Sequence, residues 1–216
     1  FEAMLRTEFG GMNTSFADLA ALTGDPEHLR LAHRFSDQRL LQPLLNREDP
    51  LTGMHANTQI AKVVGYQRLA QVVGTETPDT ETETPSTETA GSGTLNTPTG
   101  PELAGAARFF FDEVTTRRTL SFGGNSVREH FPETLAPAFE SEQGPESCNT
   151  TNMLNLSRLL FLSTTSDTCP DPAIMDFYER ATFNHILSSQ HPGGGLVYFT
   201  PARPDHYRAY SSTQAC

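Results

Sequence analysis

The sequence predicts an all-α fold with a short β hairpin near its end. Apolar residues recur at helical spacing in several long segments, whereas patterns typical of strands are confined to residues 195–201 and 206–211. Successive helical hairpins about 40 to 50 residues apart are common to solenoids and α/α toroids. Because no sequence repeat supports a solenoid, we expect part of a toroid, in which the loops at one end of the inner helices converge on a central cup.

A first pair of helices is expected between residues 12 and 35. Gly24, Asp25 and Pro26 separate its two apolar stretches, and this combination ends one helix and begins the next. The positions that recur at helical spacing are Phe16, Leu19, Ala20, Leu22, Leu29, Ala32 and Phe35.

A longer helix is expected over residues 57–74. Asn57 or Thr58 can cap its start, and Gly74 suits a left-handed end. Its apolar face comprises Ile60, Val63, Val64 and Val72.

Three further helices are expected, from Pro101 to about Arg117, from about Thr150 to Phe161 and from Pro172 to about Gln190. Steps of three or four residues return a helix to the same side. The last helix therefore has one face formed by Ile174, Tyr178, Ala181 and His185.

Residues from about 75 to 100 are expected to form a disordered insertion. Thr, Glu, Pro and Gly dominate this stretch, and almost nothing in it is apolar. A segment that cannot bury apolar surface cannot offset the entropy that is lost on ordering.

The composition excludes two classes of partner. The chain has 15 basic and 26 acidic residues, a formal net charge of -11, and its basic residues are scattered. Phosphate binding requires a clustered basic surface, so no nucleic-acid partner is expected. No apolar run approaches the roughly 18 to 20 residues of a membrane span, so no membrane association is expected.

Three cysteines, Cys148, Cys169 and Cys216, are odd in number and lie far apart. This pattern favours a reducing compartment or a metal site over a disulfide framework. The compartment stays open, with the cytoplasm favoured, and so does the oligomeric state.

Glu129 is the first candidate for catalysis. It lies in "GGNSVREHF", where Gly123 and Gly124 permit a tight turn and Phe131 can anchor the far side. A carboxylate held in this way suits a general acid. The alternative is a surface Glu that pairs with Arg128 or His130.

Glu146 and Cys148 are candidates for metal binding. They form a Glu-x-Cys motif just ahead of a predicted helix, whose free N–H groups stabilise a thiolate. In an extended segment, side chains two residues apart point to the same side, so the pair can supply two ligands of a tetrahedral zinc site. The alternative is a small buried Cys with a Glu that flanks the helix.

Among the remaining polar residues, His55 precedes the cap of the 57–74 helix, where its ring can bind a sugar hydroxyl or simply complete a turn. Tyr198 can stand over a ligand or fill the hairpin face. The sequence around His185, His191 and His206 gives less indication of a functional role. His185 is expected to be a core histidine whose ring nitrogens have hydrogen-bond partners.

Seven blocks of sequence resemble the β-L-arabinofuranosidase family, glycoside hydrolase family 127, and its close relative family 146. In order they cover essentially the whole chain except the Thr-rich insertion. The blocks are "EFGGMN", "ADLAALTGDPEHLRLAHRF", "DPLTGMHANTQIAKVVG", "GGNSVREHF", "ESCNTTNMLNLSRLLF", "YERATFNHILSSQHP" and "YFTPARPDHYRAYS".

The resemblance implies an (α/α)6 toroid followed by β-sandwich domains. Residues 1–216 look like the later part of the toroid alone, a partial glycoside hydrolase catalytic domain that carries the insertion. The implied substrates are arabinose-containing glycans or glycoconjugates.

The resemblance also implies roles for individual residues. Glu129 matches the general acid/base. Glu146 and Cys148 match two ligands of a Zn²⁺ held by one Glu and three Cys, and Glu146 is counted as a substrate contact as well. His55 matches a sugar-contacting His, and Tyr198 matches a Tyr near the reactive carbon.

The implied chemistry is retaining hydrolysis with a zinc-bound Cys as the nucleophile. In the family an adjacent Cys pair soon after the "HYRAYS" block supplies the other two ligands and the nucleophile. Here the chain ends "SSTQAC", so Cys216 is a candidate for that group, and a nucleophile beyond residue 216 is the favoured expectation. The alternative function is a truncated, catalytically inactive fragment with at most weak sugar binding.

Overall fold

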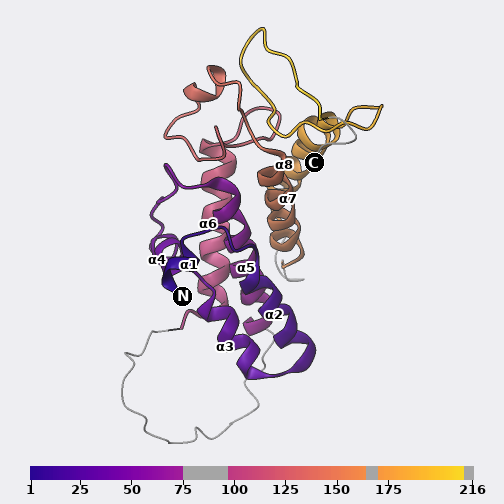
Figure 1. Cartoon of the computed structure of the whole chain (residues 1–216). Coiled ribbons are helices and arrows are strands. Elements are labelled where there is room, and N and C mark those ends of the chain that lie inside the picture. Colours follow the sequence, from indigo (N-terminus) through magenta and orange to yellow (C-terminus); the bar gives the residue numbers. More distant parts are fainter. Residues whose placement is uncertain (75–96, 164–169, 212–216) are drawn as a thin grey trace, which may run out of the picture.

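The protein, as a computed structural model, is described over residues 1–74, 97–163 and 170–211. This part of the chain is all-α, as the sequence predicts, and its extended backbone pairs only in isolated bridges (Figure 1). The α-helices are α1 (Glu2–Leu5), α2 (Met12–Thr23), α3 (Pro26–Arg34), α4 (Gln38–Leu45), α5 (Ala56–Gly74), α6 (Gly100–Arg117), α7 (Ser147–Leu162) and α8 (Pro172–Ala181). Shorter turns are η1 (Ala136–Phe139), η2 (Thr182–Ile186) and η3 (Leu187–Ser189).

Helix α5 is the centre of the arrangement, with α2, α6 and α7 packed around it (Figure 1). Helices α5 and α7 run in the same direction, because Asn57 bonds Asn152 near their starts and Gln71 bonds Ser163 near their ends. Helix α6 runs the opposite way, since Arg118 at its end pairs with Asp49 ahead of α5. The alternation suits an α/α toroid, whose closure into six pairs stays a prediction.

A continuous apolar core joins these helices. Its largest fully buried aromatic side chains come from α5, α6, α8 and the loop residue Phe131, and Phe111 meets Phe177 edge to face at 5.6 Å between ring centroids. Burial of one such side chain stabilises the fold by about 1.5–3 kcal/mol. In the described part of the chain, no helix is long and apolar enough to cross a membrane.

The predicted hairpin of helices between residues 12 and 35 is confirmed. Gly24 ends α2 in the left-handed conformation at φ 68°, which is open to glycine at little cost. The Asp25 side chain then accepts a hydrogen bond from the Glu27 N–H at 2.9 Å, and Pro26 opens α3.

Other helix boundaries differ from the predictions by a few residues. Helix α7 begins at Ser147, three residues earlier than expected, so that Cys148 lies in its first turn rather than ahead of it. The single helix expected from Pro172 to about Gln190 is α-helical only to Ala181 and continues as the π turn η2 and the 3-10 turn η3. Helix α4 was not predicted, because it has 8 residues and contains Pro43.

The β hairpin expected from residues 195–201 and 206–211 is not confirmed. The two segments meet where the Ser211 N–H donates to the Leu196 carbonyl at 2.8 Å. Elsewhere the first segment pairs with other loops: Val197 N–H donates to Ser189, and Thr200 N–H donates to Pro145. Pro201 and Pro204, which lie at and between the two segments, have no backbone N–H to donate to a strand ladder.

The expected insertion at about 75–100 falls mostly on residues 75–96, outside the described part of the chain. Its last residues lead into α6. There the Thr99 hydroxyl and the Glu102 carboxylate form a reciprocal capping box at the start of the helix.

The one lysine of the sequence, Lys62 on α5, forms a buried ion pair. Its ammonium group lies 2.8 Å from Asp37 Oδ2, and the two side chains are 1% and 3% exposed. Burial lowers the pKa of Lys62, whereas hydrogen bonds from Arg39 and Lys62 outweigh burial and lower the pKa of Asp37. Lys62 also donates to the Leu5 carbonyl at 2.8 Å, so one cation joins α1, α4 and α5.

Replacement of this lysine, Lys62→Met, is expected to lower the free energy of unfolding by about 3–5 kcal/mol, because it removes the buried cation from Asp37 and leaves the carboxylate with the half-exposed Arg39 as its cationic partner. Urea denaturation of the full-length gene product measures this change. Arg30→Met, which breaks the exposed pair between Arg30 and Glu27 on α3, is the matched control. That control is expected to change stability by less than about 1 kcal/mol. Equal effects of the two substitutions would contradict the account.

Candidate active site

Two glycines shape the loop between α6 and η1. A Cβ atom on Gly123 would lie 2.5 Å from the Ala181 Cα, and φ at Gly123 is +97°. A Cβ atom on Gly124 would lie 2.6 Å from the Pro145 side chain. The predicted tight turn is therefore confirmed, and the pair is needed because the loop passes against α8 and against the residue that precedes Glu146.

After the glycines the chain makes a tight turn with Glu129 near its tip. Val127 and His130 exchange backbone hydrogen bonds of 2.9 and 3.0 Å. Three residues here, Ser126, Arg128 and Glu129, have φ values of 81°, 47° and 69°. Non-glycine residues in this region are strained by about 1–3 kcal/mol each, and such strain persists where surrounding contacts fix the backbone.

Those contacts come from the segment that leads into α5. The Glu129 carbonyl accepts from the Ala56 N–H at 2.7 Å, and the Met54 carbonyl accepts from the Phe131 N–H at 2.9 Å. Phe131 is buried against Phe110 and anchors the far side of the turn, as predicted. The docking brings Glu129 beside His55.

Glu129 faces polar groups from two distant segments. The Tyr198 hydroxyl donates to Glu129 Oε1 at 3.2 Å, and His55 Nε2 lies 3.8 Å from Glu129 Oε2. His55 is itself held by Thr58, whose hydroxyl is 3.2 Å from His55 Nδ1. Glu129 pairs with neither of the surface partners that were the alternative, and its side chain is 38% exposed.

Glu146 is the buried carboxylate of the site. It precedes α7, and the segment of Tyr198 holds it: Ser147 N–H donates to the Tyr198 carbonyl at 3.2 Å, and Glu146 and Phe199 form an antiparallel bridge. Glu146 is 2% exposed, and its Oε2 atom has no hydrogen-bond partner among the described residues. An unpartnered buried carboxylate oxygen is costly unless a cation or donor meets it.

Cys148 adjoins this carboxylate from the first turn of α7. Burial, together with the nearby Glu146 carboxylate, raises the pKa of the Cys148 thiol to about 11. The thiolate expected from the helix N-terminus is therefore not favoured by these protein groups alone, because burial and a like charge outweigh the helix N–H groups. A positive ion between the two groups would reverse that balance.

Tyr198 connects the two carboxylates. Burial raises the pKa of Tyr198 above its ordinary value, and so do the adjoining carboxylates, first Glu146 and then Glu129. The phenol consequently stays protonated and can donate a hydrogen bond. The five predicted residues thus converge: Glu129, His55, Tyr198, Glu146 and Cys148.

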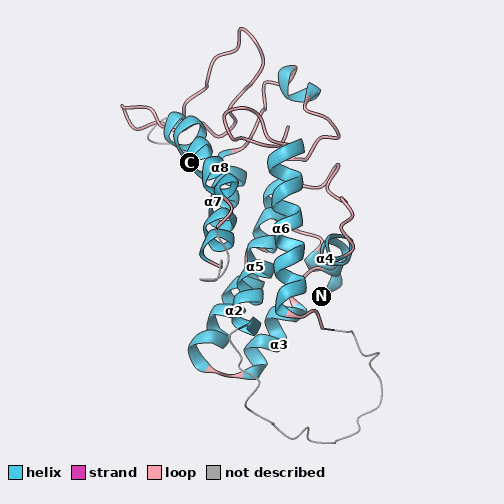
Figure 2. Cartoon of the chain, turned by 180° about the vertical axis from the view of Figure 1, so that it is seen from behind, coloured by secondary structure: helices cyan, strands magenta, loops and turns pink. Residues whose placement is uncertain are grey.

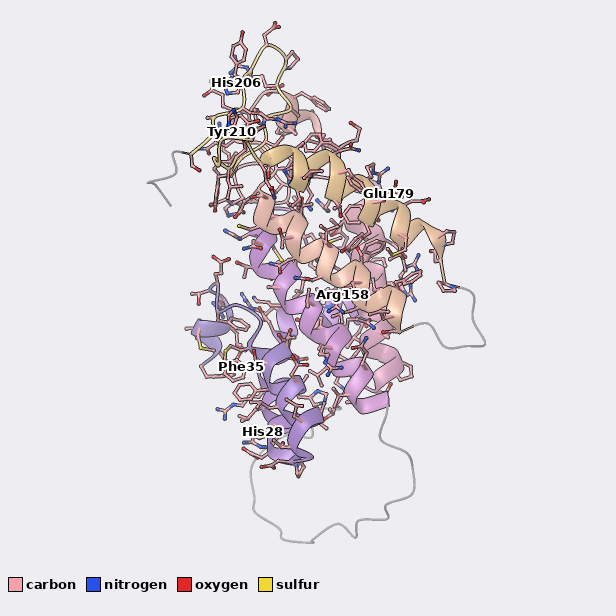
Figure 3. All side chains as sticks on the ribbon, turned by 90° about the vertical axis from the view of Figure 1, so that its right-hand side faces the viewer. His28, Phe35, Arg158, Glu179, His206 and Tyr210 are labelled. Carbon is pink, nitrogen blue, oxygen red and sulfur yellow. The ribbon has the colours of Figure 1, made fainter. Side chains whose placement is uncertain are left out.

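His130 packs edge to face on His55, with 5.3 Å between the ring centroids, whereas His185, His191 and His206 lie outside this convergence of contacts. His185 is fully buried between the hydroxyls of Thr150 and Thr200, at 2.7 and 3.1 Å, and burial lowers its pKa to about 4. It is a satisfied core histidine, as predicted. His191 stacks edge to face on Tyr210, and Figure 3 shows Tyr210 and His206 in the loops at the end of the molecule beyond α7.

Polar residues that the sequence did not single out surround the site. Asn149 Nδ2 donates to Ser126 Oγ at 2.7 Å and ties α7 to the Glu129 loop. Glu8 accepts a hydrogen bond from Asn57 Nδ2 at 3.0 Å. Glu8 lies in the "EFGGMN" block and Asn149 in "ESCNT". The blocks that carry the family resemblance could therefore have indicated that these two residues lie near the site.

Metal-binding groups are incomplete in the described part of the chain. Residues 1–74, 97–163 and 170–211 contain no group of three His, Cys, Asp or Glu side chains arranged to hold a metal ion. Glu146 and Cys148 supply two suitable donors at one place. Cys169 and Cys216 lie outside the described residues.

Comparison with solved structures supports the fold. The chain is similar to the crystal structure of Ara127N, a GH127 β-L-arabinofuranosidase from Geobacillus stearothermophilus T6, with a TM-score of 0.60 and 18% sequence identity. The match covers 88% of this chain and 30% of that chain, so the present chain spans less than a third of its structural relative. A search of curated proteins finds no match.

Comparison of the sequence with protein families gives a match over the whole chain. Residues 1–216 match the family described as β-L-arabinofuranosidase, GH127 catalytic domain. The resemblance of the seven blocks is thereby confirmed. The chain belongs to the glycoside hydrolase family 127 catalytic domain family.

Proposed function

We propose that the chain is part of a retaining glycoside hydrolase that removes terminal β-L-arabinofuranose from arabinose-containing glycans or glycoconjugates. The observation that carries this proposal is the position of the Tyr198 hydroxyl, which donates to Glu129 and adjoins Glu146. This hydroxyl lies between the half-exposed Glu129 carboxyl and the buried Glu146 carboxylate, and the Cys148 thiol adjoins Glu146. The relative Ara127N is named as a β-L-arabinofuranosidase, which supports the choice of sugar.

Glu129 acts as the general acid and base in this proposal. Its half-exposed carboxyl can reach the glycosidic oxygen of a bound sugar and donate a proton as the C–O bond breaks. In the second half of the reaction the same carboxylate removes a proton from water. Tyr198 orients it by donating to Oε1, and His55, 3.8 Å from Oε2, is placed to bond a sugar hydroxyl.

Glu146 and Cys148 fit a zinc ion. The unpartnered buried Oε2 of Glu146 and the neighbouring thiol are an oxygen and a sulfur donor, both of which zinc accepts. When bound there, zinc would keep a nucleophilic Cys thiolate deprotonated and oriented toward the anomeric carbon. Two more ligands are required for a tetrahedral site, and Cys216 is one candidate.

The substitution Glu129→Gln is expected to lower turnover of an aryl β-L-arabinofuranoside by about 10²–10⁴-fold in the full-length gene product, because the amide cannot transfer the proton. Steady-state kinetics measure the loss, and thermal unfolding checks that the fold is intact. Glu133→Gln, an exposed residue beyond the same turn, is the matched control and should retain activity. Activity retained by Glu129→Gln would reject the role.

Metal content tests the ligand pair separately. The full-length gene product is expected to contain one zinc per chain by elemental analysis, and Glu146→Gln combined with Cys148→Ser should remove it, because two of the ligands are lost. Glu142→Gln, an exposed carboxylate paired with Arg203, controls for a general loss of charge. A protein without zinc would favour the alternative function, an inactive chain that binds sugar weakly.

A further inference from the structure

We propose that His185 is a positioning residue, which fixes the Tyr198 hydroxyl between Glu129 and Glu146 from a place in the core behind the site. This inference rests on the proposed function, in which Tyr198 orients Glu129. His185 is fully buried and lies in the π turn η2, which follows α8. Turns of this type are rare and occur frequently at functional sites.

The His185 ring contacts each of the three segments that build the site. Its Nδ1 atom is 2.7 Å from the Thr150 hydroxyl, and its Nε2 atom is 3.1 Å from the Thr200 hydroxyl. The Phe122 ring packs edge to face on it, with 5.2 Å between the ring centroids. Thr150 lies in the first turn of α7, and Phe122 directly precedes the glycine pair. Thr200 is two residues beyond Tyr198, so one buried ring sets the spacing of all three segments.

The segment of Tyr198 pairs with other loops through isolated bridges. Thr200 N–H donates to the Pro145 carbonyl at 2.9 Å, and the Tyr198 carbonyl accepts from Ser147 N–H at 3.2 Å. A loop held by scattered hydrogen bonds opens at a low cost in free energy. The bond between Thr200 and His185 opposes this opening, because it is buried and its loss leaves two polar groups without partners.

The position of this segment decides whether Tyr198 reaches Glu129. Tyr198 is 50% exposed, so packing alone does not fix its phenol. Its hydroxyl is 3.2 Å from Glu129 Oε1, at the long end of the range for a hydrogen bond. A displacement of the segment by about 0.5 Å would therefore break the contact that orients the general acid.

A neutral histidine suits this task. Burial lowers the pKa of His185 to about 4, so at neutral pH one ring nitrogen carries a hydrogen and the other is an acceptor. A hydroxyl both donates and accepts, so Thr150 and Thr200 can each meet either nitrogen. The ring thus joins two hydroxyls without a buried charge. An apolar side chain in its place would leave both hydroxyls without this partner.

The test removes one hydroxyl from the full-length gene product. Thr200→Val preserves the shape of the side chain but cannot bond His185. It is expected to lower kcat for an aryl β-L-arabinofuranoside about tenfold and to leave KM within about twofold, because Glu129 loses its orientation while the sugar still binds. Hydrogen exchange in residues 196–201, measured by mass spectrometry, should become about tenfold faster. Thr200→Ser, which keeps the hydroxyl, should retain the wild-type values, and Thr150→Val, which breaks the other end of the bridge, should reproduce both changes.

Tyr66→Phe is the matched control, because it removes another buried hydroxyl, which donates to the Asp37 carbonyl at 3.0 Å. It should lower the unfolding temperature and leave both kcat and the exchange of residues 196–201 unchanged. In a protein that already carries Tyr198→Phe, Thr200→Val should lower kcat no further, since the hydroxyl that it positions is absent.

A histidine that only fills the core gives a different result. Thr200→Val and Thr150→Val would then lower the unfolding temperature and leave kcat or the exchange rate unchanged, which would overturn the inference while the proposed function stands. Additive losses of kcat in the double variant would overturn it as well. A wild-type protein that does not cleave the glycoside would overturn both the proposed function and the inference.

Discussion

The backbone hydrogen bond between the Ala56 N–H and the Glu129 carbonyl, 2.7 Å long, is the constraint on which the site depends. It docks the 127–130 turn onto the start of α5, the helix on which α2, α6 and α7 pack. His55 precedes Ala56, so one contact places a carboxylate and an imidazole side by side. The strained φ of Glu129 is maintained by this docking and by the buried ring of Phe131.

The second half of the site arrives from α7 and from the loop of Tyr198. Asn149 ties the first turn of α7 to the Glu129 loop, and buried His185 joins Thr150 of α7 to Thr200 of the Tyr198 loop. These segments gather at one end of the helices, where Figure 2 shows most of the loops. This is the arrangement expected of a toroid, in which rigid helices carry a cup of functional loops.

Local signals in the sequence were sufficient for most of the long helices, but not for α4 or for the site. Gly24 and Asp25 mark the boundary between α2 and α3 because their chemistry acts within a few residues. By contrast, Tyr198 and Glu129 are 69 residues apart, and no periodicity predicts their hydrogen bond. The proposed hairpin failed for the same reason: Thr200 bonds Pro145, a partner that only the tertiary fold supplies. The family resemblance named the site residues, and the structure adds the contacts that hold them.

The central claim is that the Glu129 turn and the start of α7 face each other across one metal-assisted centre. X-ray diffraction from crystals of the full-length gene product, recorded at the zinc absorption edge, tests it most directly. One anomalous peak is expected at about 2.0–2.3 Å from a Glu146 oxygen and the Cys148 sulfur, with Tyr198 between that peak and Glu129. A peak bound elsewhere, or Glu129 turned away from Tyr198 and His55, would contradict it.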